Sequence, residues 1–202
     1  MKKLKEERTK LKNFGMNWPE SVISEELLYL KITPDSSLEE LRSIGSCYVG
    51  ISLRNRFFHG NVFPRLLAWI DQNFERCLFV LGDYIERFNY MLFDNCQSSD
   101  AGLLALAAGQ EFMSKIKPSL TSLGGPKFSI ALWREILQTK EFMRSEQHVK
   151  RLYLNNDAFK TSLQGTAQTY LKRQTLRNRK FSVSSTEALQ LCSEYLLEEI
   201  AV

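Results

Sequence analysis

The chain has 202 residues, of which 44% are apolar and 25% are charged. This length suits one domain, and a chain of this size buries a core without disulfides or metals. No segment approaches the run of about 20 apolar residues that spans a bilayer, and an aromatic content of 11% excludes an intrinsically disordered chain. The net charge is only +4, so a polyanionic partner must be bound through local basic clusters.

The cysteines are too far apart in sequence to form a CxxC pair, and only two histidines could join them as ligands. The pattern therefore excludes a structural zinc site, and nothing in the sequence calls for a metal or an organic cofactor. The N-terminal segment is charged and lacks the apolar centre of a signal peptide. Free thiols without an export signal predict a cytoplasmic protein that does not bind a membrane.

Strand and helix patterns alternate along the first half of the chain. Residues 1–20 are expected to form a polar arm, and a helix is expected at 37–44. Continuous apolar runs at 46–52 and 77–82 predict buried strands, and apolar residues at helical spacing predict a helix at 60–75. A strand, a helix and a second strand in this order form a βαβ unit with parallel strands.

The second half of the chain is mostly helical. A helix is expected at 101–117, a turn at 123–126 and a third strand at 127–132, followed by helices to about residue 179. Ser185 is expected to cap a last helix that runs to the C-terminus. The whole chain is therefore predicted to be a single α/β domain with a mainly parallel sheet and helices on both faces.

Ser52 follows a Gly-Ile pair at the carboxyl end of the first predicted strand, where open parallel sheets bind their ligands. Taken alone, Gly-x-Ser is weak evidence for a nucleophile. The hydrolase elbow requires a glycine two residues after the serine, where Arg54 stands. His59 and His148 lie in no recognisable catalytic context, so a nucleophilic Ser52 would act outside a Ser-His-Asp triad.

Three further polar residues have both a structural and a functional interpretation. Asn55 is either a turn residue or an amide that binds a polar ligand group beside Ser52. Tyr195 and Glu199 are four residues apart on the last predicted helix, so they share a face. They are either a core tyrosine with a solvated glutamate, or a hydroxyl and a carboxylate that bind an ammonium group or move its proton.

Basic residues gather in two places. One set has five members within nine positions: Lys172, Arg173, Arg177, Arg179 and Lys180. No acidic residue lies between Ala158 and Ser185, which favours a contact with a phosphate backbone over an ordinary solvated face. The smaller set is Lys115 and Lys117.

Two separate motifs together resemble the cyclodipeptide synthases. The first is the Gly-Ile-Ser-Leu-Arg-Asn-Arg-Phe-Phe segment at 50–58, followed by an apolar helix and a strand that ends near Asp83. The second is the Tyr-x-x-x-Glu pattern of Tyr195 and Glu199 on the last helix. Both patterns are similar to signatures of that family, and they occur in the family's order.

This resemblance implies a Rossmann-like catalytic domain over residues 1–202, similar to class I aminoacyl-tRNA synthetases. It implies a monomeric enzyme whose partners are two aminoacyl-tRNAs, used in turn to make a cyclic dipeptide, a 2,5-diketopiperazine. The chain carries neither the synthetase ATP signature nor a Walker loop, which agrees with substrates already activated as esters. Relatives continue beyond the Tyr-x-x-x-Glu helix, so the C-terminal part of the family domain is expected to be missing after residue 202.

The resemblance also implies a ping-pong mechanism. Ser52 would take the first aminoacyl group as an ester, and the second aminoacyl-tRNA would supply the amine. Cyclisation would then release the product. Tyr195 and Glu199 would bind the first ammonium group, with Glu199 later accepting a proton, and Gly50 and Asn55 would line the site.

Specificity and tRNA binding are assigned by position in the same resemblance. Two groups of residues would form side-chain pockets: Tyr48, Val80 and Trp133 for the first aminoacyl group, and Gly82 and Asn178 for the second. Tyr48 and Trp133 stand where relatives often have smaller aliphatic residues, and both could equally be ordinary core residues. The tRNA contacts would come from Lys115, Lys117, Lys172, Arg173 and Arg177.

Two alternatives remain open from the sequence. A non-catalytic RNA-binding domain of the same fold needs only the basic residues and would survive the loss of Ser52. An unrelated serine hydrolase needs a histidine near Ser52, for which the sequence offers poor candidates.

Overall fold

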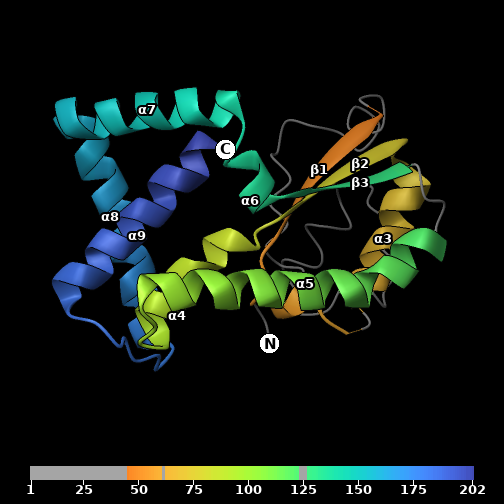
Figure 1. The fold of residues 1–202 in the computed structure, drawn as a ribbon, viewed down its shortest axis with the longest axis horizontal. Coiled ribbons are helices and arrows are strands. Elements are labelled where there is room, and N and C mark those ends of the chain that lie inside the picture. The colour runs from red at the N-terminus through yellow and green to blue at the C-terminus, as the bar shows by residue number, and fades with distance from the viewer. Residues whose placement is uncertain (1–44, 61, 123–126) are drawn as a thin grey trace, which may run out of the picture. The chain divides into compact units, whose positions relative to one another are not determined.

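The computed structural model describes residues 45–60, 62–122 and 127–202. It contains a three-stranded parallel sheet flanked by helices, with the strand order β1-β2-β3 (Figure 1). The strands are β1 (Ser46–Ile51), β2 (Arg76–Leu81) and β3 (Phe128–Leu132). The predicted α/β fold with a parallel sheet is therefore confirmed. The expected polar arm at 1–20, helix at 37–44 and turn at 123–126 lie outside the described residues.

Helices make up most of the rest of the described chain. Before β2 come η2 (Arg56–Phe58) and α3 (Val62–Asn73); between β2 and β3 come η3 (Tyr84–Glu86), α4 (Arg87–Phe93) and α5 (Ser98–Ser122). After β3 come α6 (Trp133–Ile136), α7 (Lys140–Asn155), α8 (Asp157–Leu176) and α9 (Ser185–Ala201). None of these helices is both long enough and apolar enough to cross a membrane.

The chain divides into two compact units. The first contains the described residues up to Phe79 together with Ile116–Ile130. Its core includes rings that meet edge to face or tilted: Phe63 of α3 lies 5.9 Å from Phe79 of β2, and Phe79 lies 5.8 Å from Phe128 of β3, measured between ring centroids. Aromatic contacts of this kind fix α3 against the strands.

The second unit contains Val80–Lys115 and Ala131–Val202. In it α7, α8 and α9 pack against one another, and α9 also packs against α4. Ala167 of α8 and Ala188 of α9 are buried in one cluster, where their small side chains allow the helices to approach closely. The expected cap of α9 is corrected by one residue, because it is the Ser184 side chain that accepts a hydrogen bond from the amide of Glu187.

Substitution by alanine is expected to have opposite effects on stability at two helical glycines. A Cβ on Gly109 of α5 would lie 2.5 Å from the Cβ of Asp83, whereas a Cβ on Gly165 of α8 would meet nothing within 4 Å. Alanine at 165 should stabilise the chain by up to about 1 kcal/mol through helix propensity alone. At 109 the overlap is with an atom anchored to backbone, so Gly109→Ala should destabilise by about 1–3 kcal/mol. Denaturant unfolding of both variants measures the difference, and equal stabilisation would contradict the Gly109–Asp83 packing.

Candidate active site

Ser52 is the first residue after β1, and it is exposed. Its carbonyl oxygen accepts a hydrogen bond from the amide of Asn55 at 3.1 Å, which closes a tight turn. The Asn55 side chain accepts from the amide of Phe57 at 3.0 Å and so begins η2. Asn55 is thus a turn residue, and Ser52 and Asn55 lie at the two ends of the turn. The role of Asn55 in ligand binding remains a prediction. A Cβ added to Gly50 would meet no atom of the described residues within 4 Å, so none of them fills the space beside this strand end.

His59 belongs to the same local structure. Its Nε2 lies 2.7 Å from the carbonyl oxygen of Leu53. A nitrogen that donates to a carbonyl carries a proton, so this atom is not available as a base. This contact does not favour the serine-hydrolase interpretation.

The expectation that β1 is buried on both faces is wrong for one face. Ser46, Tyr48 and Gly50 are exposed and alternate with more buried neighbours, as in a strand with one open face. Tyr48 is 61% exposed, so it is not a core residue. Its assignment to a substrate pocket remains a prediction.

Tyr195 and Glu199 are brought together on α9, with the tyrosine hydroxyl 3.4 Å from Oε1 of Glu199. The Tyr195 ring packs edge to face on Phe88 of α4, with centroids 6.0 Å apart. Burial, and to a lesser degree the nearby Glu199 carboxylate, raises the pKa of the Tyr195 hydroxyl, which therefore stays protonated as a donor. Glu199 is an exposed residue, but partial desolvation of its carboxyl raises the pKa of that group, and the hydrogen bond from Tyr195 opposes the shift. A carboxylate with a raised pKa is a stronger base than an ordinary glutamate.

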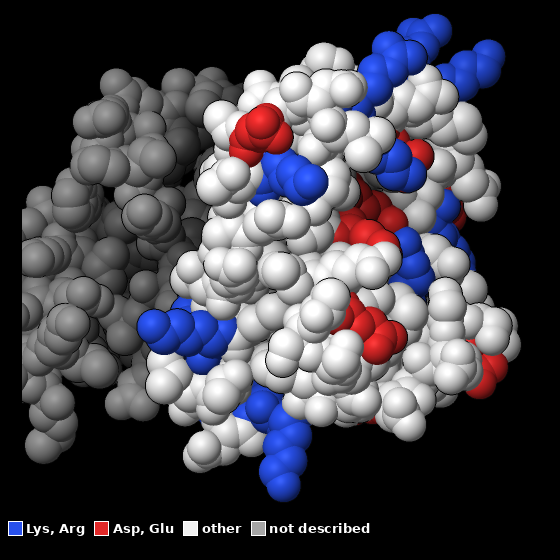
Figure 2. Space-filling view, turned by 90° about the vertical axis from the view of Figure 1, so that its left-hand side faces the viewer, with Lys and Arg blue, Asp and Glu red and all other residues white. Residues whose placement is uncertain are grey.

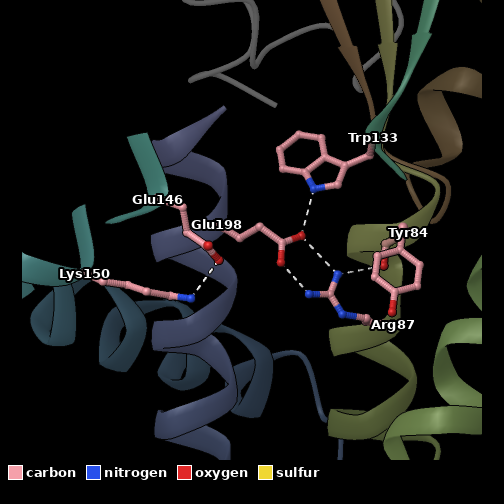
Figure 3. A network of polar contacts seen from close by, with 6 residues as sticks. All are labelled: Tyr84, Arg87, Trp133, Glu146, Lys150 and Glu198. Carbon is pink, nitrogen blue, oxygen red and sulfur yellow. Dashed lines mark hydrogen bonds and ion pairs between the residues drawn. The ribbon is translucent and has the colours of Figure 1, made fainter. Parts of the chain in front are cut away.

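The neighbouring residue Glu198 is the centre of a polar network that the sequence analysis missed (Figure 3). Glu198 is 9% exposed. Arg87 of α4 donates to both of its carboxylate oxygens, at 3.0 Å to Oε1 and also to Oε2. The indole Nε1 of Trp133 donates to Oε1 at 2.8 Å. Helical spacing alone does not reveal which of two adjacent glutamates is buried, and the helix that carries Arg87 was not predicted.

The residues assigned to side-chain pockets have different surroundings. Val80 and Trp133 belong to one apolar cluster, against which Tyr195 packs. Trp133 is 6% exposed, as a core residue would be, and its assignment to a substrate pocket remains a prediction. Gly82 is buried directly after β2. Asn178 is exposed in the left-handed region with φ 58°, where it ends α8, a position that suits asparagine without any ligand.

Basic side chains are exposed at all five positions assigned to tRNA. Lys115 forms an ion pair at 2.6 Å with Glu111 one turn earlier on α5. Figure 2 shows one face of the molecule, on which Lys and Arg side chains lie in separate groups with acidic side chains between them. Among the described residues, no group of three histidine, cysteine, aspartate or glutamate side chains is arranged to hold a metal ion.

Comparison with known proteins decides the family. The family model described as cyclodipeptide synthase matches residues 40–202, which is most of the chain and includes both sequence motifs. The chain belongs to the cyclodipeptide synthase family. The resemblance noted from 50–58 and from the Tyr195–Glu199 pair is therefore confirmed. No curated protein matches the chain by sequence.

Solved cyclodipeptide synthases share the fold. One from Fluoribacter dumoffii is 22% identical, with a TM-score of 0.70 over 83% of this chain and 74% of that protein. A Mycobacterium tuberculosis protein, whose structure relates cyclodipeptide synthetases to type I tRNA synthetases, is 16% identical, with a TM-score of 0.65 over 82% and 70%. One from Candidatus Glomeribacter gigasporarum, bound to Phe-tRNAPhe, is 22% identical, with a TM-score of 0.58 over 77% and 70%. The predicted Rossmann-like, synthetase-related fold is thus confirmed.

Proposed function

We propose that this cyclodipeptide synthase joins two aminoacyl groups through an aminoacyl ester on Ser52. The observation that carries the proposal is the exposed hydroxyl-bearing residue at the carboxyl end of β1, in a Gly-x-Ser-x-x-Asn turn. Ligands of open parallel sheets bind at such strand ends. Because aminoacyl-tRNAs are made where translation takes place, we also propose that the chain works in the cytoplasm. Its resemblance to the family supports the proposal that it works as a monomer.

The first step is a transesterification. The Ser52 oxygen attacks the aminoacyl carbonyl carbon, the bond to the tRNA ribose oxygen breaks, and that oxygen leaves with the serine proton. An ester exchanged for an ester needs no further energy source, which agrees with the lack of an ATP signature in the sequence. The second aminoacyl-tRNA then supplies an amine that attacks the Ser52 ester. This forms a dipeptidyl-tRNA and frees the Ser52 hydroxyl, which then attacks the ester of the dipeptidyl-tRNA and releases the second tRNA. The free amine of the dipeptidyl group finally attacks the Ser52 ester carbonyl, which closes the ring and returns the hydroxyl to Ser52.

Tyr195 and Glu199 are proposed to bind the ammonium group of the first aminoacyl residue. A hydroxyl and a carboxylate 3.4 Å apart offer two acceptor oxygens to an ammonium, which has three donors. The raised pKa of Glu199 suits the same carboxylate to accept the proton that the amine must lose before it attacks. Gly50 and Asn55 would line the ester end, and Tyr48, Val80, Trp133, Gly82 and Asn178 the side-chain pockets.

The direct test of this function is product analysis. The purified chain is incubated with a mixture of charged tRNAs, and cyclic dipeptides are measured by mass spectrometry. Accumulation of cyclic dipeptide beyond the molar amount of protein supports the proposal. Binding of tRNA without any product would instead favour an RNA-binding domain of the same fold.

We further propose that the exposed basic residues near the end of α8 contact the tRNA backbone. Support comes from their exposure, from the absence of acidic residues in this segment and from the tRNA-bound relative. Replacing Lys172, Arg173 and Arg177 together by glutamine should weaken tRNA binding. The slope of log affinity against log salt should flatten by roughly one unit for each lost phosphate contact.

A matched variant distinguishes a local contact with tRNA phosphates from an effect of the overall charge. Lys140, Arg144 and Lys150 on α7 are also exposed, and their replacement by glutamine removes the same number of charges. Binding titrations at several salt concentrations should show a flatter slope only for the α8 variant. An equal change in both variants would mean that the α8 residues make no specific phosphate contact.

A further inference from the structure

Arg87 is held on several sides within the second unit. Besides its two hydrogen bonds to the Glu198 carboxylate, it donates to the backbone carbonyl of Tyr84 at 3.1 Å. Its guanidinium carbon lies 4.3 Å from the centre of the Tyr84 ring and 4.2 Å from that of Phe88. The side chain is only 14% exposed. A planar guanidinium bound at both oxygens of a carboxylate fixes direction as well as distance, which a lysine cannot do.

The partner of Arg87 lies one residue before Glu199. Successive residues of an α-helix are about 100° apart around its axis, so the direction of Glu198 determines the direction of Glu199. With Glu198 fixed to Arg87 and Trp133, the Glu199 side chain is the exposed member of the pair. Phe88 follows Arg87 on α4, and its ring packs on Tyr195, which lies one turn before Glu199 on α9. Two adjacent residues of α4 thus fix α9 at the level of both proposed ammonium ligands.

Stability alone does not account for such a pair. Replacing a buried ion pair by well-packed apolar residues of similar volume is often neutral or stabilising, because both charges must be removed from water. In some proteins such a pair instead selects one arrangement among several that apolar packing would tolerate. The helix α9 has apolar residues on several sides, so apolar packing alone would allow more than one rotation about its axis. A carboxylate that is fixed in place would select one of these rotations.

We propose that Arg87 and Glu198, with Trp133, are positioning residues that set the rotation of α9 and so direct Tyr195 and Glu199 toward the substrate ammonium group. The inference rests on the proposed roles of Tyr195 and Glu199 and deepens them. None of the three positioning residues touches the reacting atoms. Their effect is on the fraction of bound substrate that is correctly oriented, which lowers kcat more than it raises KM.

The decisive variant replaces both charges at once. Arg87→Met with Glu198→Met leaves no unpaired buried charge, although the Trp133 indole loses its acceptor, so the melting temperature should fall by only a few degrees. Its kcat for cyclic dipeptide should fall by about tenfold to a hundredfold, with little change in KM for aminoacyl-tRNA. The single variant Arg87→Lys keeps the charge without the two-pronged geometry, and it should give an intermediate kcat.

Two controls make the outcome specific. Glu146→Gln removes the partner of Lys150 in the largely exposed ion pair of α7, drawn in the same view, and should leave kcat unchanged (Figure 3). Glu199→Gln tests the proposed function itself: if it retains full activity, the ammonium site is wrong regardless of Arg87.

If Glu199→Gln is inactive but the double methionine variant has the parent kcat, the positioning role is overturned. It is also overturned if the Arg87 variants lose activity only in proportion to their unfolded fraction. If the double variant does not fold, Arg87→Lys decides by the same kcat and KM comparison.

Discussion

Replacing Ser52 by alanine is expected to abolish formation of the cyclic dipeptide, by more than about a thousandfold, because removal of a covalent nucleophile leaves only binding and orientation. The fold should remain intact. Ser52 is exposed, and the hydrogen bond that closes its turn uses the backbone carbonyl rather than the hydroxyl. The free energy of unfolding should therefore change by no more than about 0.5 kcal/mol. Product formation is followed by mass spectrometry, and stability by denaturant unfolding.

Ser46 provides a matched control on the same strand. It is an exposed serine at the start of β1, and Ser46→Ala should keep the parent activity. A Ser52→Ala chain that still makes product at a comparable rate would show that no covalent intermediate forms on Ser52. Equal losses in the two variants would show that the effect comes from β1 and not from the nucleophile.

Glu199→Gln is expected to lower product formation by on the order of a hundredfold or more, since it removes both the charge that binds ammonium and the proton acceptor. The amide keeps the shape of the side chain, so the fold should be unaffected. Some aminoacyl-enzyme should still form, because Ser52 remains. Tyr195→Phe removes a single hydrogen bond to a charged group, worth about 1.5–3 kcal/mol, so a loss of roughly tenfold to a hundredfold is expected.

The raised pKa of Glu199 adds a signed pH dependence to this prediction. Ammonium binding requires the ionised carboxylate. Activity should therefore fall as the pH drops through the raised pKa, at a higher pH than for an ordinary glutamate. Glu199→Gln has nothing to titrate there and should lack this acidic limb in its pH–rate profile.

Glu194 on the same helix is the control for this pair. It is exposed and accepts a hydrogen bond from Gln190, so Glu194→Gln should retain activity and the acidic limb. An acidic limb that persists in Glu199→Gln would assign the titration to another group. Full activity of that variant would remove Glu199 from the mechanism.

The sheet could be predicted from sequence because its strands are short apolar runs bounded by polar or glycine residues. The strands β1 and β2 and the helix α3 were predicted within a few residues of their observed bounds. The segment that forms η3 and α4 was missed, since aromatic residues, Arg87 and Glu86 are mixed there without a clear helical period. The period disappears because α4 contacts its surroundings on more than one side, including α9.

The local part of the site was also predictable, whereas the long-range part was not. The turn from Ser52 to Asn55 depends on four consecutive residues, so sequence spacing is enough to describe it. Glu198 is separated from Arg87 by 111 positions. Nothing in either segment marks them as partners, because the same residues on exposed helix faces would look identical in sequence. The hydrogen bond from the Trp133 indole to the Glu198 carboxylate joins residues 65 positions apart and was likewise not predictable.

The most direct test of the aminoacyl-Ser52 intermediate is the intact mass of the protein after brief mixing with aminoacyl-tRNA. The proposed mechanism predicts a species heavier by one aminoacyl residue, with the added mass on the peptide that contains Ser52. The adduct should be absent from Ser52→Ala and present in Ser46→Ala. An adduct that maps to another residue, or that persists in Ser52→Ala, would contradict the mechanism, as would cyclic dipeptide formed without any adduct.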